Sequence, residues 1–138
     1  MALYIDKKKN LWIGTHGSGF VKVSMAGKGR VERDSDDDSI VLSFFEDSEE
    51  NIWVGTLGSG LKVIKNGLFT SIGKKDGIDS ESLIALFESS DKVLWVGSER
   101  GDIFSISDGI VSKVVPNLSA GYSSVYGFEE FPGYGVLI

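Results

Sequence analysis

The chain has 138 residues, the length of one domain, and a formal net charge of −6, which argues against binding to nucleic acid or to anionic membrane surfaces. It contains no cysteine and one histidine, so disulfides, thiolate metal sites and most multi-histidine metal centres are excluded. The 18 glycines and two prolines, together with many β-branched and aromatic residues, predict short strands joined by tight turns.

The N-terminal part of the chain holds the first copy of an internal repeat. Residues 6–23 ("DKKKNLWIGTHGSGFVKV") align without a gap with residues 47–64, and both align with residues 89–106. A period of about 40–45 residues with several short strands is that of a propeller blade. The repeat positions to which we assign structural roles are Trp12, Gly14, Trp53, Gly55, Trp95 and Gly97.

The second copy defines the strands of one unit. Its alternating pattern predicts four strands, at residues 40–46, 51–56, 61–65 and 68–72. Residues 79–88, which begin the third copy, could by themselves start a capped helix. Their counterpart in the second copy is rich in β-branched and aromatic residues, so we predict a strand there too.

The Trp-x-Gly pair in each copy has a structural explanation. Both faces of a blade are covered by its neighbours, and a flat tryptophan side chain fills that space. The glycine two residues later lies on the same face of the strand, where it leaves room for the adjacent blade. No ligand is needed to explain the motif.

The predicted fold is therefore all-β, a single domain of propeller blades with four antiparallel strands each, comprising about three blades and a partial fourth. A fourth copy of the first strand is expected at residues 124–129, followed by the start of a second strand. The expected blades are residues 3–33 (blade 1), 39–73 (blade 2), 82–115 (blade 3) and 123–138 (blade 4).

Two segments resemble a known family. The runs "YIDKKKNLWIGTHGSGFVKV" and "FFEDSEENIWVGTLGSGLKVI" are similar to the two-component regulator propeller repeat. The third copy departs from that pattern, with Ser98 in place of the threonine and residues 99–102 ("ERGD") in place of "LGSG". The resemblance implies the sensor region of a bacterial hybrid histidine kinase or a related regulator, outside the cytoplasm. The start of the chain lacks the form of a signal peptide, so the compartment stays open.

Several features could indicate chemistry, and each has a structural alternative. The glycine-rich residues 14–19 and 55–60 suggest a phosphate loop, but a strand follows each of them, so turns are expected. The acidic residues 34–39 could bind calcium, yet they lack the pattern of an EF-hand loop. His16 has no matched polar partner in the other copies and is expected at the surface. We therefore expect no metal and no cofactor.

Charged residues at the repeated turns also have both a functional and a structural interpretation. Residues 7–9 form a basic run, whereas the matching turn of the second copy is acidic, which favours a polar turn over a binding patch. Glu46, Glu88 and Glu129 recur at the end of the first strand. Paired carboxylates are typical of glycosidases, but their recurrence in every copy favours a structural role, so no catalytic residue is assigned. In the tail, aromatic residues could stack on sugars, although packing is expected.

The resemblance implies a non-catalytic sensory module, which would bind a small molecule such as a carbohydrate or serve only in dimerisation. The alternatives are a structural scaffold for protein interaction and, with less support, a glycoside-active enzyme. Because closed propellers have about 4–8 blades, three blades would leave bare faces. The chain is then either a piece of a larger propeller or a unit that associates head to tail into a ring.

Overall fold

The computed structural model describes residues 1–26, 29–34, 38–115 and 124–138. They form three four-stranded antiparallel sheets and one two-stranded hairpin. The strands of blade 1 are β1 (Leu3–Ile5), β2 (Asn10–Gly14), β3 (Phe20–Ser24) and β4 (Arg30–Arg33). Those of blade 2 are β5 (Ile40–Glu46), β6 (Ile52–Leu57), β7 (Leu61–Lys65) and β8 (Leu68–Ile72). Those of blade 3 are β9 (Leu83–Glu88), β10 (Leu94–Ser98), β11 (Ile103–Ser107) and β12 (Ile110–Val115).

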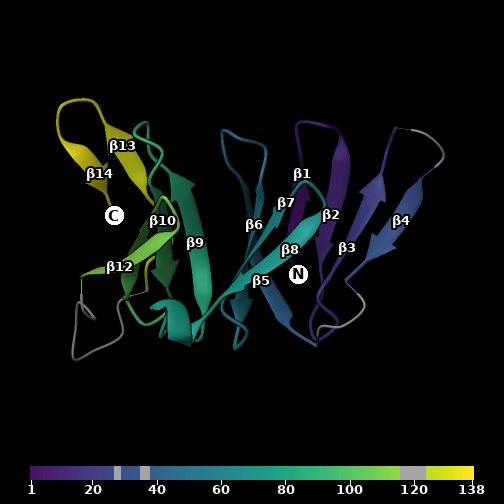
Figure 1. Ribbon diagram of the computed structural model, residues 1–138, viewed down its shortest axis with the longest axis horizontal. Helices are drawn as coiled ribbons and strands as arrows, with labels where there is room; N and C mark the ends of the chain where they lie inside the picture. Colours follow the sequence, from purple (N-terminus) through teal and green to yellow (C-terminus); the bar gives the residue numbers. More distant parts are fainter. Residues whose placement is uncertain (27–28, 35–37, 116–123) are drawn as a thin grey trace.

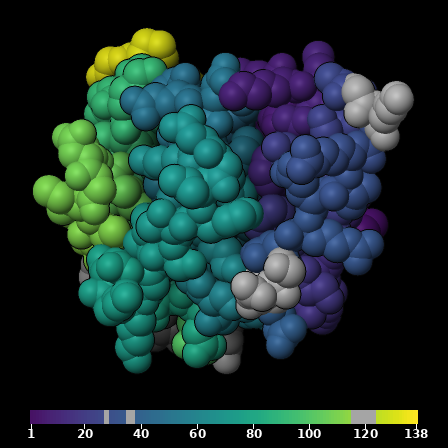
Figure 2. Space-filling view, turned by 45° about the vertical axis from the view of Figure 1, so that its right-hand side comes forward, coloured from purple at the N-terminus to yellow at the C-terminus, as the bar shows by residue number. Residues whose placement is uncertain are grey.

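The three blades stand side by side in chain order, from the purple N-terminal sheet to the green third sheet (Figure 1). In every blade the strands pair in sequence order, so each connection is a hairpin. The space-filling view shows the blades side by side, with the second blade between the first and the third (Figure 2). The predicted all-β fold with blades of four antiparallel strands is confirmed.

The strand predictions within blade 2 agree closely with the structure. Three of the four predicted ranges are those of β5, β7 and β8, and β6 begins and ends one residue later than predicted. Residues 83–88 form strand β9, so the strand interpretation is confirmed over the capped helix. A short 3-10 helix (Lys74–Asp76) lies in the linker between blades 2 and 3.

The prediction of a strand at residues 124–129 is wrong. Residues 124–128 are not in a strand, and the hairpin consists of β13 (Glu129–Phe131) and β14 (Gly135–Leu137). The reason is the length of the partner strand. All three residues of β14 pair with β13, whereas β6 pairs with β5 from Ile52 to Leu57.

The hydrophobic core lies between the blades, because each sheet buries its faces against its neighbours. One cluster joins blades 2 and 3 and includes Trp53, Leu61 and Phe104. A second cluster joins blades 1 and 2, and a third joins blade 3 to Val125, just before the hairpin. Within the described residues, no helix is long and apolar enough to cross a membrane.

Candidate functional site: the junctions between blades

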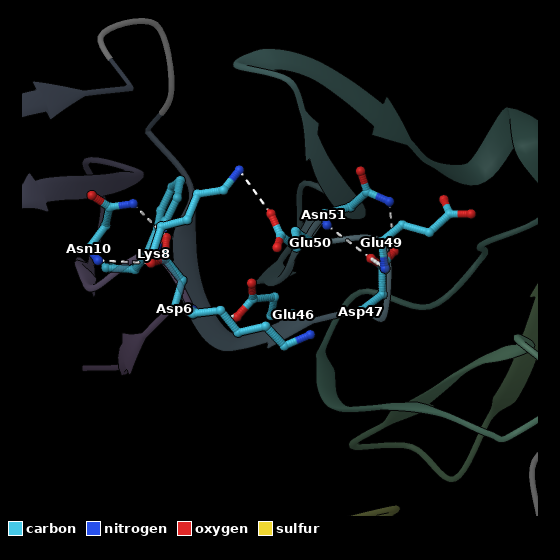
Figure 3. A network of polar contacts seen from close by, with 10 residues as sticks. Asp6, Lys8, Asn10, Glu46, Asp47, Glu49, Glu50 and Asn51 are labelled. Carbon is cyan, nitrogen blue, oxygen red and sulfur yellow. Dashed lines mark hydrogen bonds and ion pairs between the residues drawn. The ribbon is translucent and has the colours of Figure 1, made fainter.

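The turn between the first and second strands of each blade is built around a buried acceptor. In blade 1 the carboxylate of Asp6 accepts hydrogen bonds from the backbone N–H and the side-chain amide of Asn10, each at 2.8 Å. It also accepts one from Nε1 of Trp12 at 2.9 Å. Asp6 therefore fixes the turn through Asn10 (Figure 3). It also orients the indole of Trp12, which lies in the core between blades 1 and 2.

Blade 2 repeats this arrangement, and blade 3 simplifies it. Asp47 accepts from the backbone and side-chain nitrogens of Asn51 at 2.9 Å and from Nε1 of Trp53 at 2.8 Å. In blade 3 the hydroxyl of Ser89 accepts from Nε1 of Trp95 at 3.1 Å. The six-residue spacing between acceptor and tryptophan is visible in the sequence, but its meaning as a hydrogen-bonded pair was missed there.

The electrostatic state of the two aspartates follows from these contacts. Burial alone would raise the pKa of Asp47, but the hydrogen bonds from Trp53 and Asn51 outweigh it and lower the pKa below the ordinary value. The pKa of Asp6 is lowered for the same reasons, by Trp12 and Asn10 against the effect of burial. Both groups are therefore carboxylates at neutral pH, poorly suited to donate a proton.

The repeated glycines lie where the next blade approaches most closely. A Cβ atom on Gly14 would lie 2.6 Å from Cγ1 of Val41, and one on Gly55 would lie 2.5 Å from the backbone oxygen of Leu83. A Cβ on Gly97 would lie 2.7 Å from Cβ of Val125. No real Cβ atom tolerates such distances, so these three positions accept only glycine unless the neighbouring blade shifts.

Successive blades are joined by a contact that we call the glutamate latch. The carboxylate of Glu46, at the end of β5, accepts a hydrogen bond from the backbone N–H of Lys7 in the turn of blade 1 at 2.9 Å. Glu88, at the end of β9, accepts from the backbone N–H of Ser48 in the turn of blade 2 at 3.0 Å. The last residue of one blade's first strand thereby holds the turn of the blade before it.

The third latch corrects the sequence alignment. Glu130 accepts hydrogen bonds from the backbone N–H of Ser90 at 2.8 Å and from its hydroxyl at 2.6 Å. Glu130, and not Glu129, is thus the counterpart of Glu46 and Glu88. The recurrence of a glutamate was visible in the sequence, but its exact position depended on a contact between blades.

The charges of the turns complement one another across the junctions. Nζ of Lys8 in blade 1 lies 2.9 Å from a carboxylate oxygen of Glu50 in blade 2 (Figure 3). Nζ of Lys92 in blade 3 donates to the hydroxyl of Ser48 in blade 2 at 2.7 Å. The reversal of sign between the basic turn of blade 1 and the acidic turn of blade 2 therefore gives an ion pair between adjacent blades.

A cleft of about 480 Å³ opens between blades 2 and 3. Its apolar wall includes Trp53, Val63 and Leu94, and its polar groups include Thr70 and Lys92. Two smaller hollows, of about 210 and 140 Å³, lie between blades 1 and 2. Because each cleft combines side chains of two blades, none could be predicted from the repeat alone.

The glycine-rich segments and His16, which the sequence suggested as possible sites, lie in or next to turns between strands. The glycine-rich segments begin at the ends of β2 and β6 and continue through the turns that lead to β3 and β7, which confirms the turn interpretation. His16 is exposed in the first of these turns. Residues 35–37 of the acidic run lie outside the described residues. Among those described, no three His, Cys, Asp or Glu side chains are grouped to hold a metal ion.

The aromatic residues of the tail divide into two groups. Phe128 packs against Trp95, with ring centroids 6.3 Å apart. Phe131 and Tyr134, in the hairpin, are 50% and 86% exposed. Packing therefore explains the aromatic side chain of Phe128 but not those of Phe131 and Tyr134.

Comparisons with known proteins agree with the fold. The family model described as two component regulator propeller matches residues 1–17 and 34–58, which confirms the resemblance in blades 1 and 2. The fold is similar to that of the extracellular domain of a hybrid two component system from B. thetaiotaomicron, with a TM-score of 0.72 and 20% identity. The match covers 97% of this chain and 19% of that chain. No curated relative matches the sequence.

Proposed function

We propose that this chain, which contains repeats of the two component regulator propeller, is part of the sensory region of a two-component-type signalling protein and has no catalytic activity. The observation that supports this most is the use of its recurrent acidic residues. Asp6 and Asp47 hold the tryptophans, and Glu46 holds the turn of the preceding blade. These carboxylates stabilise the blades and are not free for acid–base chemistry.

The cleft between blades 2 and 3 is the proposed binding site. Its volume of about 480 Å³ falls within the range of about 300–1,000 Å³ that is usual for small-molecule sites. An apolar wall beside polar and charged side chains, which include Thr70, Glu88 and Lys92, suits a carbohydrate, which offers both C–H faces and hydroxyls. A cleft formed by two blades can also couple binding to the angle between them.

Calorimetric titration with a panel of neutral mono- and oligosaccharides tests this function. Thr70 is exposed on β8 and lines the cleft, so Thr70→Trp should fill it and reduce the affinity for a bound sugar at least about tenfold. Ser112 occupies the matching position on β12 and does not line this cleft, so Ser112→Trp is the control. Equal loss in both variants, unchanged binding in Thr70→Trp, or hydrolysis of the sugar would contradict the proposal.

A protein-interaction scaffold without a small ligand is the second candidate. The outer strand β8 is an edge of its sheet and exposes Leu68 (73%) and Phe69 (56%), which favours contact with another protein. Failure of every sugar in the panel to bind would support this alternative. The similar solved structure is an extracellular domain, which supports a position outside the cytoplasm in either case.

A further inference from the structure

The glutamate latch follows one rule along the chain. The acceptor is the glutamate of the first strand that pairs with Ile52, Leu94 or Val136 in the second strand, and the donor is a backbone N–H in the turn of the preceding blade. The rule holds at all three junctions, with donor–acceptor distances of 2.9, 3.0 and 2.8 Å. It also identifies the positions that blade 1 and the hairpin would contribute to a further junction, the acceptor in blade 1 and the donor in the hairpin.

The strand register identifies the acceptor position in blade 1. Ile5 pairs with Leu11, just as Glu46 pairs with Ile52 in blade 2. Ile5 therefore stands where the other blades carry the latch glutamate. Its side chain offers no acceptor, and the residue is 63% exposed.

The terminal turn identifies the donor position. It runs from Phe131 to Gly135 and is closed by a hydrogen bond from the backbone N–H of Tyr134 to the oxygen of Phe131 at 3.0 Å. The equivalent bond in blade 2 runs from Glu50 to Asp47 at 3.1 Å. The position that follows Phe131, which corresponds to the latch donors, is occupied by proline.

Donor and acceptor are thus missing together at the two ends. Pro132 has no N–H to donate, and Ile5 has no oxygen to receive it. If only one had been replaced, a junction between these ends would leave a polar group buried without a partner, which is unfavourable. With both replaced, the acceptor position and the donor position both carry apolar side chains.

The same hairpin lacks both partners of a second hydrogen bond. Phe131 stands where Asp47 stands in blade 2, and Leu137 stands where Trp53 stands, so the aspartate–tryptophan hydrogen bond has also lost both partners. Phe131 and Leu137 are 50% and 49% exposed. The hairpin therefore presents an apolar surface in the place where the other blades carry a polar turn.

We propose that the terminal hairpin binds blade 1 of a second copy of this chain, head to tail, with Phe131 and Pro132 against Ile5. This contact continues the series of blade junctions already present within one copy. Since it joins two different surfaces, it produces a ring if the rotation closes and a fibre if it does not. The proposal concerns assembly and goes beyond the sensory role.

Light scattering behind a sizing column, over a range of protein concentrations, tests the proposal. The unmodified chain should form an oligomer. Ile5→Glu should raise the dissociation constant at least about tenfold, because the contact would bury a carboxylate without a partner. Adding Pro132→Ser supplies the missing N–H, so the double variant Ile5→Glu/Pro132→Ser should recover most of the affinity.

Ile110→Glu is the control, because Ile110 is 69% exposed on β12 and belongs neither to β1 nor to the hairpin. Ile5 and Pro132 are also exposed, so these replacements should preserve the fold, which circular dichroism verifies. A monomeric unmodified chain at every concentration would overturn the proposal. So would equal effects of Ile5→Glu and Ile110→Glu, or a double variant as weak as Ile5→Glu alone.

Discussion

At the scale of single residues, the buried aspartates of the turns contribute strongly to stability. Asp47 is 6% exposed and satisfies Trp53 and Asn51 at once. Asp47→Ala should lower the free energy of unfolding by about 2–3 kcal/mol, because charged hydrogen bonds are lost and a buried indole N–H is left without an acceptor. Urea unfolding measures this. Glu49→Ala in the same turn, where the side chain is exposed, should change the free energy little, and a similar effect of both would contradict the prediction.

The same residues predict how stability depends on pH. The pKa values of Asp6 and Asp47 are lowered in the folded chain, so their stabilising contribution is complete above the ordinary pKa of about 3.9. It is lost as the pH falls through that value towards the folded-state pKa. The melting temperature should therefore fall steeply in acid, and less steeply in the double variant Asp6→Asn/Asp47→Asn. Parallel profiles would show that these carboxylates do not cause the acid sensitivity.

The junction glycines allow a graded test. Gly55→Ala should destabilise the chain by about 2 kcal/mol or more, because the new Cβ would lie 2.5 Å from the backbone oxygen of Leu83, which cannot rotate away. Gly127 has no atom within 4 Å of such a Cβ, so Gly127→Ala is the control. Thermal unfolding of the two variants gives the comparison. Equal melting temperatures would show that the backbone at Leu83 moves to admit the added methyl group.

At the scale of elements, the latch should control local opening of the turns. The backbone N–H of Ser48 donates to Glu88, so Glu88→Ala should speed hydrogen exchange of that amide at least about tenfold. Glu81→Ala removes only an exposed ion pair with Arg100 and should leave the exchange unchanged. Two-dimensional NMR resolves the amide. An unaltered rate in Glu88→Ala would mean that other contacts hold the turn.

The repeat made most elements predictable, because three aligned copies fix the register of strands better than any one copy. The C-terminal hairpin was harder to predict from the sequence. Its sequence invites an alignment of Phe128 with Phe45, which puts Glu129 opposite Glu46, and only the contact of Glu130 with Ser90 shows the shift by one residue. Neither the latch nor the clefts could be predicted, because each depends on side chains about 40 residues apart that meet only when blades stack.

At the scale of the whole molecule, stability should vary along the chain, as in other repeat structures where each unit contacts only its neighbours. Blade 2 has a blade on each side, and Val54 in β6 is fully buried. In the dissociated Ile5→Glu variant, whose hairpin is uncovered, hydrogen exchange followed by mass spectrometry should therefore show the slowest exchange in β6 and β7 and the fastest in β13 and β14. Uniform protection would indicate one cooperative unit instead.

The ion pair between Lys8 and Glu50 also lets near-identical blades be told apart during folding. Lys92 holds in blade 3 the position that Glu50 holds in blade 2, and both have a positive φ, 66° and 64°. If blade 1 docked on blade 3 and skipped blade 2, Lys8 would meet a lysine and be repelled. The charges of the turns thus favour docking of the blades in chain order over docking that skips a blade.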